Sequence, residues 1–413
     1  MSSPDELVQR FGTPLYVYRT AALRAAVDDL RASLPQPHRL YYSVKANPHP
    51  GVVRHFTSEG LRAEISSSGE LAVALAAGQA GNQLLYTGPG KTFEEVVHAI
   101  RSGVRYFSVE SVEDHRRLSR AATECAEQVH CIVRVNGTRS TARTGLRMTG
   151  RPSQFGIDVD TILSTPHLLA ATANVRPAGL HFFPATNVTN PQALIGEFAE
   201  SVELARQILD RMEMDALLLD LGGGFAAPFA RPGERPRYHD LRGSLERLLD
   251  TSFEGWREGK PTVAFEAGRY LVAGAGTLLT SILDVKRSGD RTFVVLDAGI
   301  NALGGMSSTG RLLPPAVLPA DGDASDEVTL VGPLCTPLDV LSRAAQVPDL
   351  RVGGLVAVPN VGAYGLTASV VAFLSRQPPL EVLLDSDESV ASVTTLSLQI
   401  VETRAAGRNA SCR

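Results

Sequence analysis

The sequence has little cysteine and no long apolar run. No stretch of the 413 residues approaches the roughly 20 apolar residues of a membrane span, and the start, MSSPDELVQRFG, lacks the pattern of a signal peptide. No Cys-x-x-Cys pair occurs and the cysteines are too few for a disulfide framework, so a reducing cytoplasm is the expected location. A net charge of −4 predicts no general attraction to nucleic acid or to membrane surfaces. The cysteines are Cys125, Cys131, Cys335 and Cys412.

Short β-rich runs alternate with longer amphipathic segments in the first two thirds of the chain. One such segment, 191–212, places Leu194, Phe198 and Val202 at helical spacing. Strands that alternate with helices over roughly 230 residues predict a (β/α)8 barrel, here residues 20–270, with an open doubly wound sheet as the alternative. The strand-like runs cover residues 39–44, 61–65, 84–87, 105–109, 130–135, 178–183, 216–221 and 262–266.

The pattern changes after residue 270. Runs such as RTFVVLDAG, EVTLVGP and GGLVAVPNVGAY are β-rich and are separated by turns. They predict an all-β second domain, an antiparallel sandwich or barrel over residues 271–402, as the length of the chain also suggests. Residues 1–19 are grouped with this domain, because PLYVYR at 14–19 is strand-like and precedes the first helix. The polar residues 403–413 are predicted to form a flexible tail.

Polar groups and glycines follow several of the predicted barrel strands. Lys45 and Glu64 end the first two, His181 ends the sixth, Gly222–Gly224 follow the seventh, and Glu266 ends the eighth. Taken singly, Lys45 could be a solvated strand end and Glu64 a helix cap. His181 could be a core histidine with its hydrogen bonds made, and the glycines could form a turn. A (β/α)8 enzyme carries its chemistry at the C-terminal ends of its strands, so together they predict one active-site mouth. A lysine amine can form a Schiff base, a glycine loop can approach a phosphate, and a carboxylate can keep a pyridine nitrogen protonated.

The motifs along the chain resemble those of the fold-type III decarboxylases that depend on pyridoxal 5′-phosphate (PLP). This family contains the diaminopimelate, ornithine and arginine decarboxylases. The resemblance runs from PLYVY at residue 14 to GAYGLTAS at 362–369, with the segments in the family's order. The segments are YYSVKANP (41–48), AEISSSGEL (63–71), SQFGID (153–158), LDLGGGF (219–225), FEAGRYLV (265–272), LDAGIN (296–301), GPLCTPLD (332–339) and GAY (362–364).

The resemblance implies PLP as the cofactor, an amino acid as the substrate and a homodimer with shared active sites. Lys45 would hold PLP as a Schiff base, and Glu266 would bond the pyridinium nitrogen. Cys335 and Asp339 would reach across the dimer interface, where Cys335 returns a proton to Cα after CO2 leaves. Thr336, which follows the cysteine, would face the substrate. The other implied cofactor contacts are Glu64, His181, Phe183, Thr186, Gly222, Gly223, Gly224, Gly268, Arg269 and Tyr364.

The chain departs from the family pattern around the expected substrate site. Where relatives read His-x-His-x-Gly-Ser, residues 181–186 read HFFPAT, so Phe183 replaces the stacking histidine and Thr186 a phosphate-binding serine. Gln154 replaces a basic residue before the FG pair. Thr336 replaces the acidic residue that meets a distal ammonium in diaminopimelate decarboxylases, and their Arg-Pro-x-Leu-Tyr segment is missing. Because an unpaired buried charge is costly, a substrate with a free distal ammonium is not expected.

These departures resemble a divergent branch of the family. It includes the decarboxylase that acts on carrier-protein-linked glutamyl groups in butirosin biosynthesis. The loop after the fifth strand, residues 137–156, has no acidic residue and could attract an acidic carrier protein, although a solvated loop explains it as well. Its basic residues are Arg139, Arg143, Arg147 and Arg151.

Three other functions stay open at this point. The first is meso-diaminopimelate decarboxylation in lysine biosynthesis, and the second is an amino-acid racemase of the same barrel family. Alanine racemases place an arginine at the pyridine nitrogen, so Glu266 favours decarboxylation. The third is a non-catalytic PLP-binding protein, which is a barrel alone. The β-rich residues after 270 and the Cys335 motif argue against it.

Overall fold

The computed structural model describes residues 3–137, 146–147, 153–164, 170–304, 327–347 and 350–400. Eight parallel strands close into a barrel, because β2 pairs with both β3 and β12 while β5 pairs with β6. The predicted (β/α)8 barrel is confirmed, and the open doubly wound sheet is wrong. The barrel strands are β2 (Arg39–Ser43), β3 (Arg62–Ile65), β4 (Leu84–Tyr86), β5 (Tyr106–Val109), β6 (Val129–Asn136), β9 (Val175–His181), β11 (Leu218–Asp220) and β12 (Thr262–Ala267).

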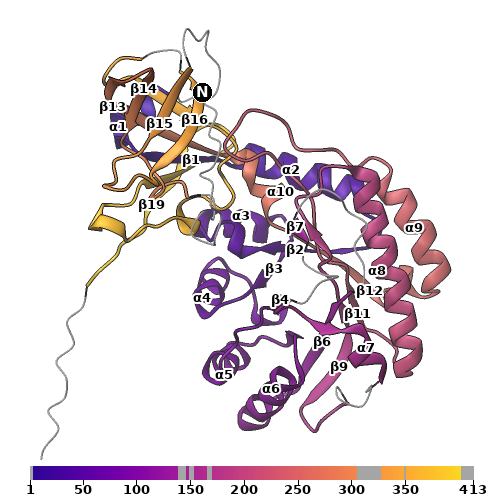
Figure 1. Ribbon diagram of the computed structural model, residues 1–413. Coiled ribbons are helices and arrows are strands. Elements are labelled where there is room, and N and C mark those ends of the chain that lie inside the picture. Colours follow the sequence, from indigo (N-terminus) through magenta and orange to yellow (C-terminus); the bar gives the residue numbers. More distant parts are fainter. Residues whose placement is uncertain are drawn as a thin grey trace, which may run out of the picture.

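Helices cover the outside of the barrel (Figure 1). Their starts follow from the local sequence: the Asn190 side chain accepts hydrogen bonds from the first backbone N–H groups of α8, and Pro191 occupies the first helical position. The helix predicted at 191–212 has those bounds in the structure. The helices are α1 (Pro4–Phe11), α2 (Thr20–Ser33), α3 (Pro50–Ser58), α4 (Ser68–Ala76), α5 (Phe93–Arg101), α6 (Val112–Cys125), α7 (Val159–Ser164), α8 (Pro191–Met212), α9 (Leu241–Ser252) and α10 (Arg269–Val272).

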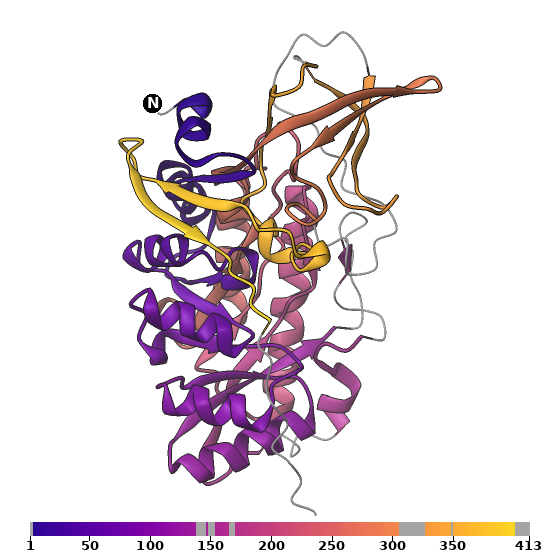
Figure 2. The same cartoon turned by 90° about the vertical axis from the view of Figure 1, so that its left-hand side faces the viewer.

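A second sheet of eight strands lies at one end of the molecule (Figure 1). The predicted N-terminal strand is confirmed as a member: β1 lies between β13 and β18, and Figure 2 shows the indigo N-terminal segment beside the yellow C-terminal strands. The sheet is mixed, whereas the sequence predicted antiparallel pairing, because β1–β18 and β14–β15 are parallel. The strands are β1 (Leu15–Arg19), β13 (Gly276–Ser288), β14 (Arg291–Leu296), β15 (Glu327–Val331), β16 (Val340–Gln346), β17 (Leu355–Val358), β18 (Leu380–Leu384) and β19 (Val390–Thr395).

Parallel pairing needs a long crossover, and the chain supplies one in both cases. The barrel and strands β13 to β17 lie between β1 and β18 in the chain, and residues 297–326 lie between β14 and β15. The limit placed at residues 270 and 271 stays a prediction, and the predicted tail at 403–413 lies outside the described residues. Within the described part of the chain, no helix is long and apolar enough to cross a membrane.

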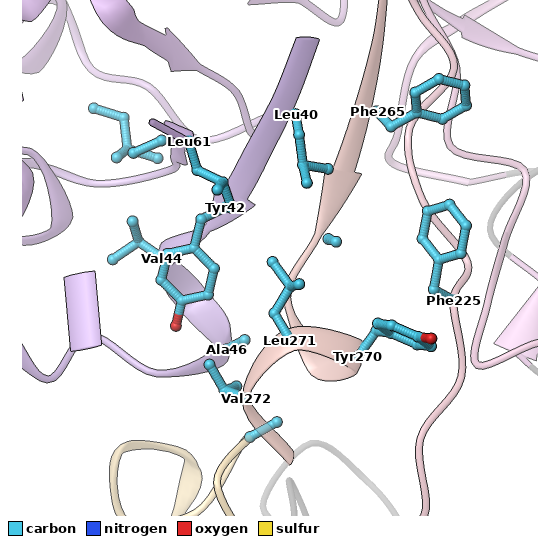
Figure 3. Packing of buried hydrophobic residues seen from close by; sticks show 14 of the residues in the cluster. Leu40, Tyr42, Val44, Ala46, Leu61, Phe225, Phe265, Tyr270, Leu271 and Val272 are labelled. Atoms are coloured by element: carbon cyan, nitrogen blue, oxygen red, sulfur yellow. The ribbon is translucent and has the colours of Figure 1, made fainter. Parts of the chain in front are cut away.

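The apolar core follows the alternation of side chains along the barrel strands. Leu40 and Tyr42 of β2 pack with Phe265 of β12 and Leu271 of α10 in the large cluster outside the barrel wall (Figure 3). The residues between them point to the other side of the strand. A separate buried cluster therefore fills the barrel interior: Tyr41, Leu85, Ile132, Ala178, Leu218 and Ala264.

Candidate active site

The barrel interior changes from apolar to polar toward the C-terminal ends of the strands. Side chains alternate, so the residue two positions after an interior apolar residue also points inward. Ser43 follows Tyr41 in this way, and Glu266 follows Ala264. The buried polar residues of this layer are Ser43, Glu64, Ser108, Arg134, His181, Asp220 and Glu266. The sequence thus builds one apolar layer and places a polar layer above it, at the mouth where a (β/α)8 enzyme works.

Lys45 lies just past the end of β2 and pairs with Glu64 of β3. It belongs to a short 3-10 turn, Val44–Ala46, so the strand ends at Ser43, one residue before the end of the predicted run 39–44. The Lys45 Nζ atom lies 3.1 Å from Glu64 Oε2, and Glu64 is 1% exposed. Glu64 also accepts a hydrogen bond from the Thr87 hydroxyl. The predicted neighbours Lys45 and Glu64 are therefore brought together at the mouth.

The electrostatics of this pair favour its charged form. Burial would lower the pKa of Lys45, but the carboxylates of Glu64 and Glu266 raise that pKa well above its ordinary value of 10.5. Burial would raise the pKa of Glu64, but Lys45 and the Thr87 hydroxyl together lower it to about 2. The lysine side chain is still 41% exposed, so it can be reached from the pocket.

Glu266 lies in a buried group of three titratable side chains. Its Oε1 atom is 3.3 Å from His181 Nε2, and both side chains are 2% exposed. The carboxylate of Asp220 belongs to the same group, in which one nitrogen or oxygen atom of each of the three side chains lies within 4.8 Å of the others. Burial would lower the pKa of His181, but Glu266 outweighs burial and raises it. Asp220 Oδ1 accepts the backbone N–H of Gly222 at 2.9 Å.

A pocket opens beside these groups, and most of the residues predicted to contact the cofactor line it. Lys45, Phe183, Thr186 and Glu266 stand on its wall with Ser43, Gly224, Phe225, Ala267, Gly268, Arg269 and Tyr364. The Arg269 guanidinium lies 4.7 Å from the centre of the Tyr364 ring. Tyr364 has a positive φ of 54°, and its N–H donates to the Ala46 carbonyl at 2.8 Å. This bond joins a loop after β17 to the Lys45 turn.

The loop after β11 needs glycine because it packs closely against neighbouring backbone, whether or not a ligand is bound. A Cβ atom on Gly222 would lie 2.1 Å from the Phe182 carbonyl oxygen, and one on Gly223 would lie 2.4 Å from that of Glu266. Both values are shorter than any real contact, so the loop can press against β9 and β12 only as glycine. Gly224, with φ of 112°, is the member of the three that lines the pocket.

Phe183 forms an aromatic wall between two cations. The centre of its ring lies 5.7 Å from Lys45 Nζ and 5.9 Å from the Arg134 guanidinium carbon. Arg134 also lies 4.7 Å from the centre of the Phe155 ring, and it pairs with the buried Glu110 at 2.9 Å. Phe183, which is predicted to replace a stacking histidine, is thus held by cation–π contacts, because its ring cannot make the hydrogen bonds of an imidazole.

The loop that carries Cys335 lies in the second sheet, between β15 and β16. Cys335 is exposed, and Thr336 is half-buried. Asp339 is 2% exposed and accepts the N–H groups of Leu334 and Ile300 at 2.7 and 2.8 Å. The carboxylate therefore shapes the loop that presents Cys335, a structural role that the sequence did not predict. That Asp339 and Cys335 reach a partner's site stays a prediction.

Comparison with known proteins identifies the family. The sequence model of one protein family, the pyridoxal binding domain of pyridoxal-dependent decarboxylases, matches residues 20–273. The chain belongs to the pyridoxal-dependent decarboxylases. It is 32% identical to the L-glutamyl-[BtrI acyl-carrier protein] decarboxylase of Niallia circulans over 91% of this chain and 90% of the relative. It is 30% identical to the diaminopimelate decarboxylase of Archaeoglobus fulgidus over 92% and 90% of the two chains.

A solved structure supports the same assignment. The diaminopimelate decarboxylase of Helicobacter pylori, complexed with L-lysine, superposes with a TM-score of 0.81 at 25% identity and covers 94% of this chain and 95% of its own. The protein is thus a PLP-dependent amino-acid decarboxylase. The predicted cofactor and enzyme class are confirmed, whereas the roles of individual residues remain predictions.

The pocket of this decarboxylase fits PLP by the chemistry of its side chains. It offers one primary amine at Lys45, one carboxylate at Glu266 and one guanidinium at Arg269, next to glycine backbone at Gly224 and Gly268. The Oε1 atom of Glu266 is buried, and it lies 3.3 Å from His181 Nε2 without meeting the geometry of a hydrogen bond. An aldehyde, a ring nitrogen and a phosphate are the groups that such a set can bind.

Several residues of the decarboxylase site were missed at the sequence level. Ser108, Arg134 and Asp220 belong to the interior polar layer but lie inside runs that read as ordinary strands. The signal that could have found them is the period of two, because each follows an interior apolar residue by two positions. Of the four loop arginines, only Arg147 lies on described backbone, in β7 (Leu146–Arg147), which pairs with β10 (Ala185–Thr186). Arg139, Arg143 and Arg151 lie outside the described residues.

Asp220 should make the decarboxylase less stable at alkaline pH. Burial and the Glu266 carboxylate raise its pKa from 3.8 to about 7. Because the folded protein holds this proton more tightly than the unfolded chain, the stabilisation is complete below pH 4 and is lost as the pH rises through 7. The shift corresponds to at most about 4 kcal/mol. We expect cofactor-free Asp220→Asn to melt above the wild type at pH 8 and at or below it at pH 4. Equal pH dependence of the two melting temperatures would contradict the assignment.

Proposed function

We propose that this decarboxylase removes the α-carboxylate of an amino acid that has no free distal ammonium group, and that it takes this substrate linked to a carrier protein. Bound PLP supplies an electron sink for the electron pair that CO2 leaves on the α-carbon. Lys45 would hold the cofactor at the pocket, and Glu266 would keep its ring nitrogen protonated. The observation that carries this proposal is the Lys45 amine and the Glu266 carboxylate on the wall of one pocket.

The distribution of carboxylates supports the proposed substrate class. Among the described pocket residues, Glu266 is the one acidic side chain, and it belongs to the buried group with His181. Thr336 stands at the position after Cys335, and its hydroxyl accepts the N–H of Leu338 at 3.3 Å. A distal ammonium would therefore be desolvated without a carboxylate to pair with. The relative from Niallia circulans is named for a glutamyl group on an acyl-carrier protein, which fits this substrate class.

Competition kinetics should rank the substrates. We expect CO2 release from a carrier-linked glutamyl thioester to show a kcat/KM at least about 100-fold above that for meso-diaminopimelate, lysine or ornithine. Free glutamate, tested beside them, measures what the carrier adds. If diaminopimelate gives by far the highest kcat/KM, the enzyme belongs to lysine biosynthesis. That second candidate is supported by the identity to the diaminopimelate decarboxylase of Archaeoglobus fulgidus.

A variant at Thr336 separates these two candidates further. Thr336→Glu restores the carboxylate that a distal ammonium needs, so kcat/KM for diaminopimelate should rise about tenfold. Thr336→Gln has the same size without the charge and should leave that value unchanged. A similar gain in both variants would show that size, and not charge, sets the preference at this position.

We further propose that two copies of the chain share their active sites. Cys335 is exposed, and its loop contacts the segment after β17, because Arg376 donates to the Pro333 carbonyl at 3.2 Å. Exposed apolar side chains stand on these two segments: Leu338 is 71%, Phe373 45% and Leu374 47% exposed. Apolar surface of this kind is what a second copy would cover.

Mixing inactive variants tests the shared site. Lys45→Ala and Cys335→Ala subunits should each be nearly inactive alone, while an equal mixture should regain about a quarter of wild-type activity. Half of the dimers are then hybrids, and each hybrid holds one intact site out of two. Subunit exchange is verified with differently tagged chains. No recovery in exchanged dimers would show that each site is built within one chain.

A further inference from the structure

Ser108 is buried beneath the pocket, and the proposed mechanism gives it no role. It lies on β5, is 0% exposed, and its hydroxyl oxygen is 2.7 Å from His181 Nδ1. Among the described residues, His181 is the one partner of this hydroxyl. The backbone of Ser108 is also anchored, because its carbonyl accepts from Lys91 Nζ at 2.9 Å and Lys91 pairs with Asp114 at 2.8 Å.

The contact with Ser108 is linked to the proton positions on the His181 ring, because its donor and acceptor depend on which ring nitrogen carries a proton. If the Ser108 hydroxyl donates to Nδ1, the neutral imidazole must have its proton on Nε2. If His181 is doubly protonated, Nε2 carries a proton as well. The remaining form, with Nε2 bare, would turn a lone pair toward the Glu266 carboxylate at 3.3 Å and toward nearby Asp220. In both favourable states His181 therefore presents an N–H to Glu266.

We propose that Ser108 is a positioning residue of this decarboxylase: it orients His181 so that Nε2–H faces Glu266, and His181 in turn keeps the Glu266 carboxylate ionised and aimed at the pocket. The chain of contacts runs from Ser108 Oγ to His181 Nδ1 and from His181 Nε2 to Glu266 Oε1. Loss of a partner that orients a metal-binding histidine typically changes activity by about 10- to 100-fold, and we expect an effect of similar size here. The inference rests on the proposed role of Glu266, so its test must separate the two.

The first measurement uses the protein without cofactor and does not depend on Glu266 chemistry. Nitrogen-15 spectra of ring-labelled histidine distinguish the two neutral forms and the charged form, and His181→Gln assigns the signal among the nine histidines. In the wild type and in Ser108→Thr, which keeps the hydroxyl, Nε2 should carry a proton. In Ser108→Ala, the neutral form with its proton on Nδ1 should become populated. If Ser108→Ala leaves the His181 spectrum unchanged, the proposal is overturned.

The second measurement follows the effect into the pocket. With 15N-labelled PLP bound, the ring-nitrogen signal of Ser108→Ala should move toward that of Glu266→Gln, and kcat should fall about tenfold with KM within a factor of three. Ser33→Ala is the control, since Ser33 is a buried serine on α2 that donates to the Asp29 carbonyl. A ring-nitrogen signal unaltered in Ser108→Ala but altered in Glu266→Gln overturns the proposal for Ser108 alone. A signal unaltered in Glu266→Gln overturns the proposed role of Glu266 instead.

Discussion

Replacing Lys45 by alanine is expected to reduce kcat by about four orders of magnitude, because the amine that attaches the cofactor is lost. The chain has four lysines, which makes the assignment unusually easy to test. Lys91 is buried against Asp114, and Lys260 and Lys286 are exposed away from the pocket. Borohydride reduction of the loaded wild type, followed by peptide mapping, should place the pyridoxyl group on Lys45.

A matched variant separates chemistry from folding at this position. Lys45→Arg keeps a cation beside Glu64 but has no primary amine, so it should melt near the wild type and still fail to retain the cofactor after borohydride treatment. A pyridoxyl group found on Lys91, Lys260 or Lys286 would contradict the assignment. Substantial turnover in Lys45→Ala would do so as well.

The second large effect is expected at Glu266. Glu266→Gln should lower kcat by roughly 10²- to 10³-fold, since a neutral amide cannot keep the ring nitrogen charged, while cofactor affinity falls far less. The change is close to isosteric, so the contact with His181 and the wall of the pocket are kept. Steady-state kinetics beside a cofactor titration separates the two quantities.

A control for Glu266 comes from the second sheet. Glu381 of β18 is also buried and accepts from the Tyr18 hydroxyl at 2.7 Å, but it lies outside the pocket lining. Glu381→Gln should leave kcat unchanged, even if it alters the melting temperature. An unchanged kcat in Glu266→Gln would remove the carboxylate from the mechanism.

The sequence predicted the barrel well because its signal is local. Strands such as 39–44 and 262–266 are short β-rich runs that end in a residue of unusual chemistry, and each appears in the structure within two or three residues. The same rule found Lys45, Glu64 and Glu266. This rule missed Ser108 and Asp220. Whether a serine or an aspartate within a β-rich run points into the barrel or out of it is known only when the neighbouring strands are known.

Pairing between distant segments could not be predicted from local patterns. The run at 14–19 indicated a strand, but nothing in it shows that β18 would run parallel beside it. Asp339 was interpreted through its motif as an interface residue. Its buried contact with Ile300 depends on how two residues 39 positions apart meet in the folded chain.

The place of β1 in its sheet bears on how the chain is made. Its partners are residues 276–279 and 380–384, so the first strand to leave the ribosome waits for about two thirds of the polypeptide before one edge can pair, and for almost all of it before the other can. Until then Leu15 and Val17, which end buried with Val382 and Leu384, are exposed to solvent. The strands between residues 39 and 267 need only one another and can assemble meanwhile. The N-terminal strand is thus among the last to be paired. A chain that is released early leaves an unpaired edge on this strand, which can pair with other chains and cause aggregation.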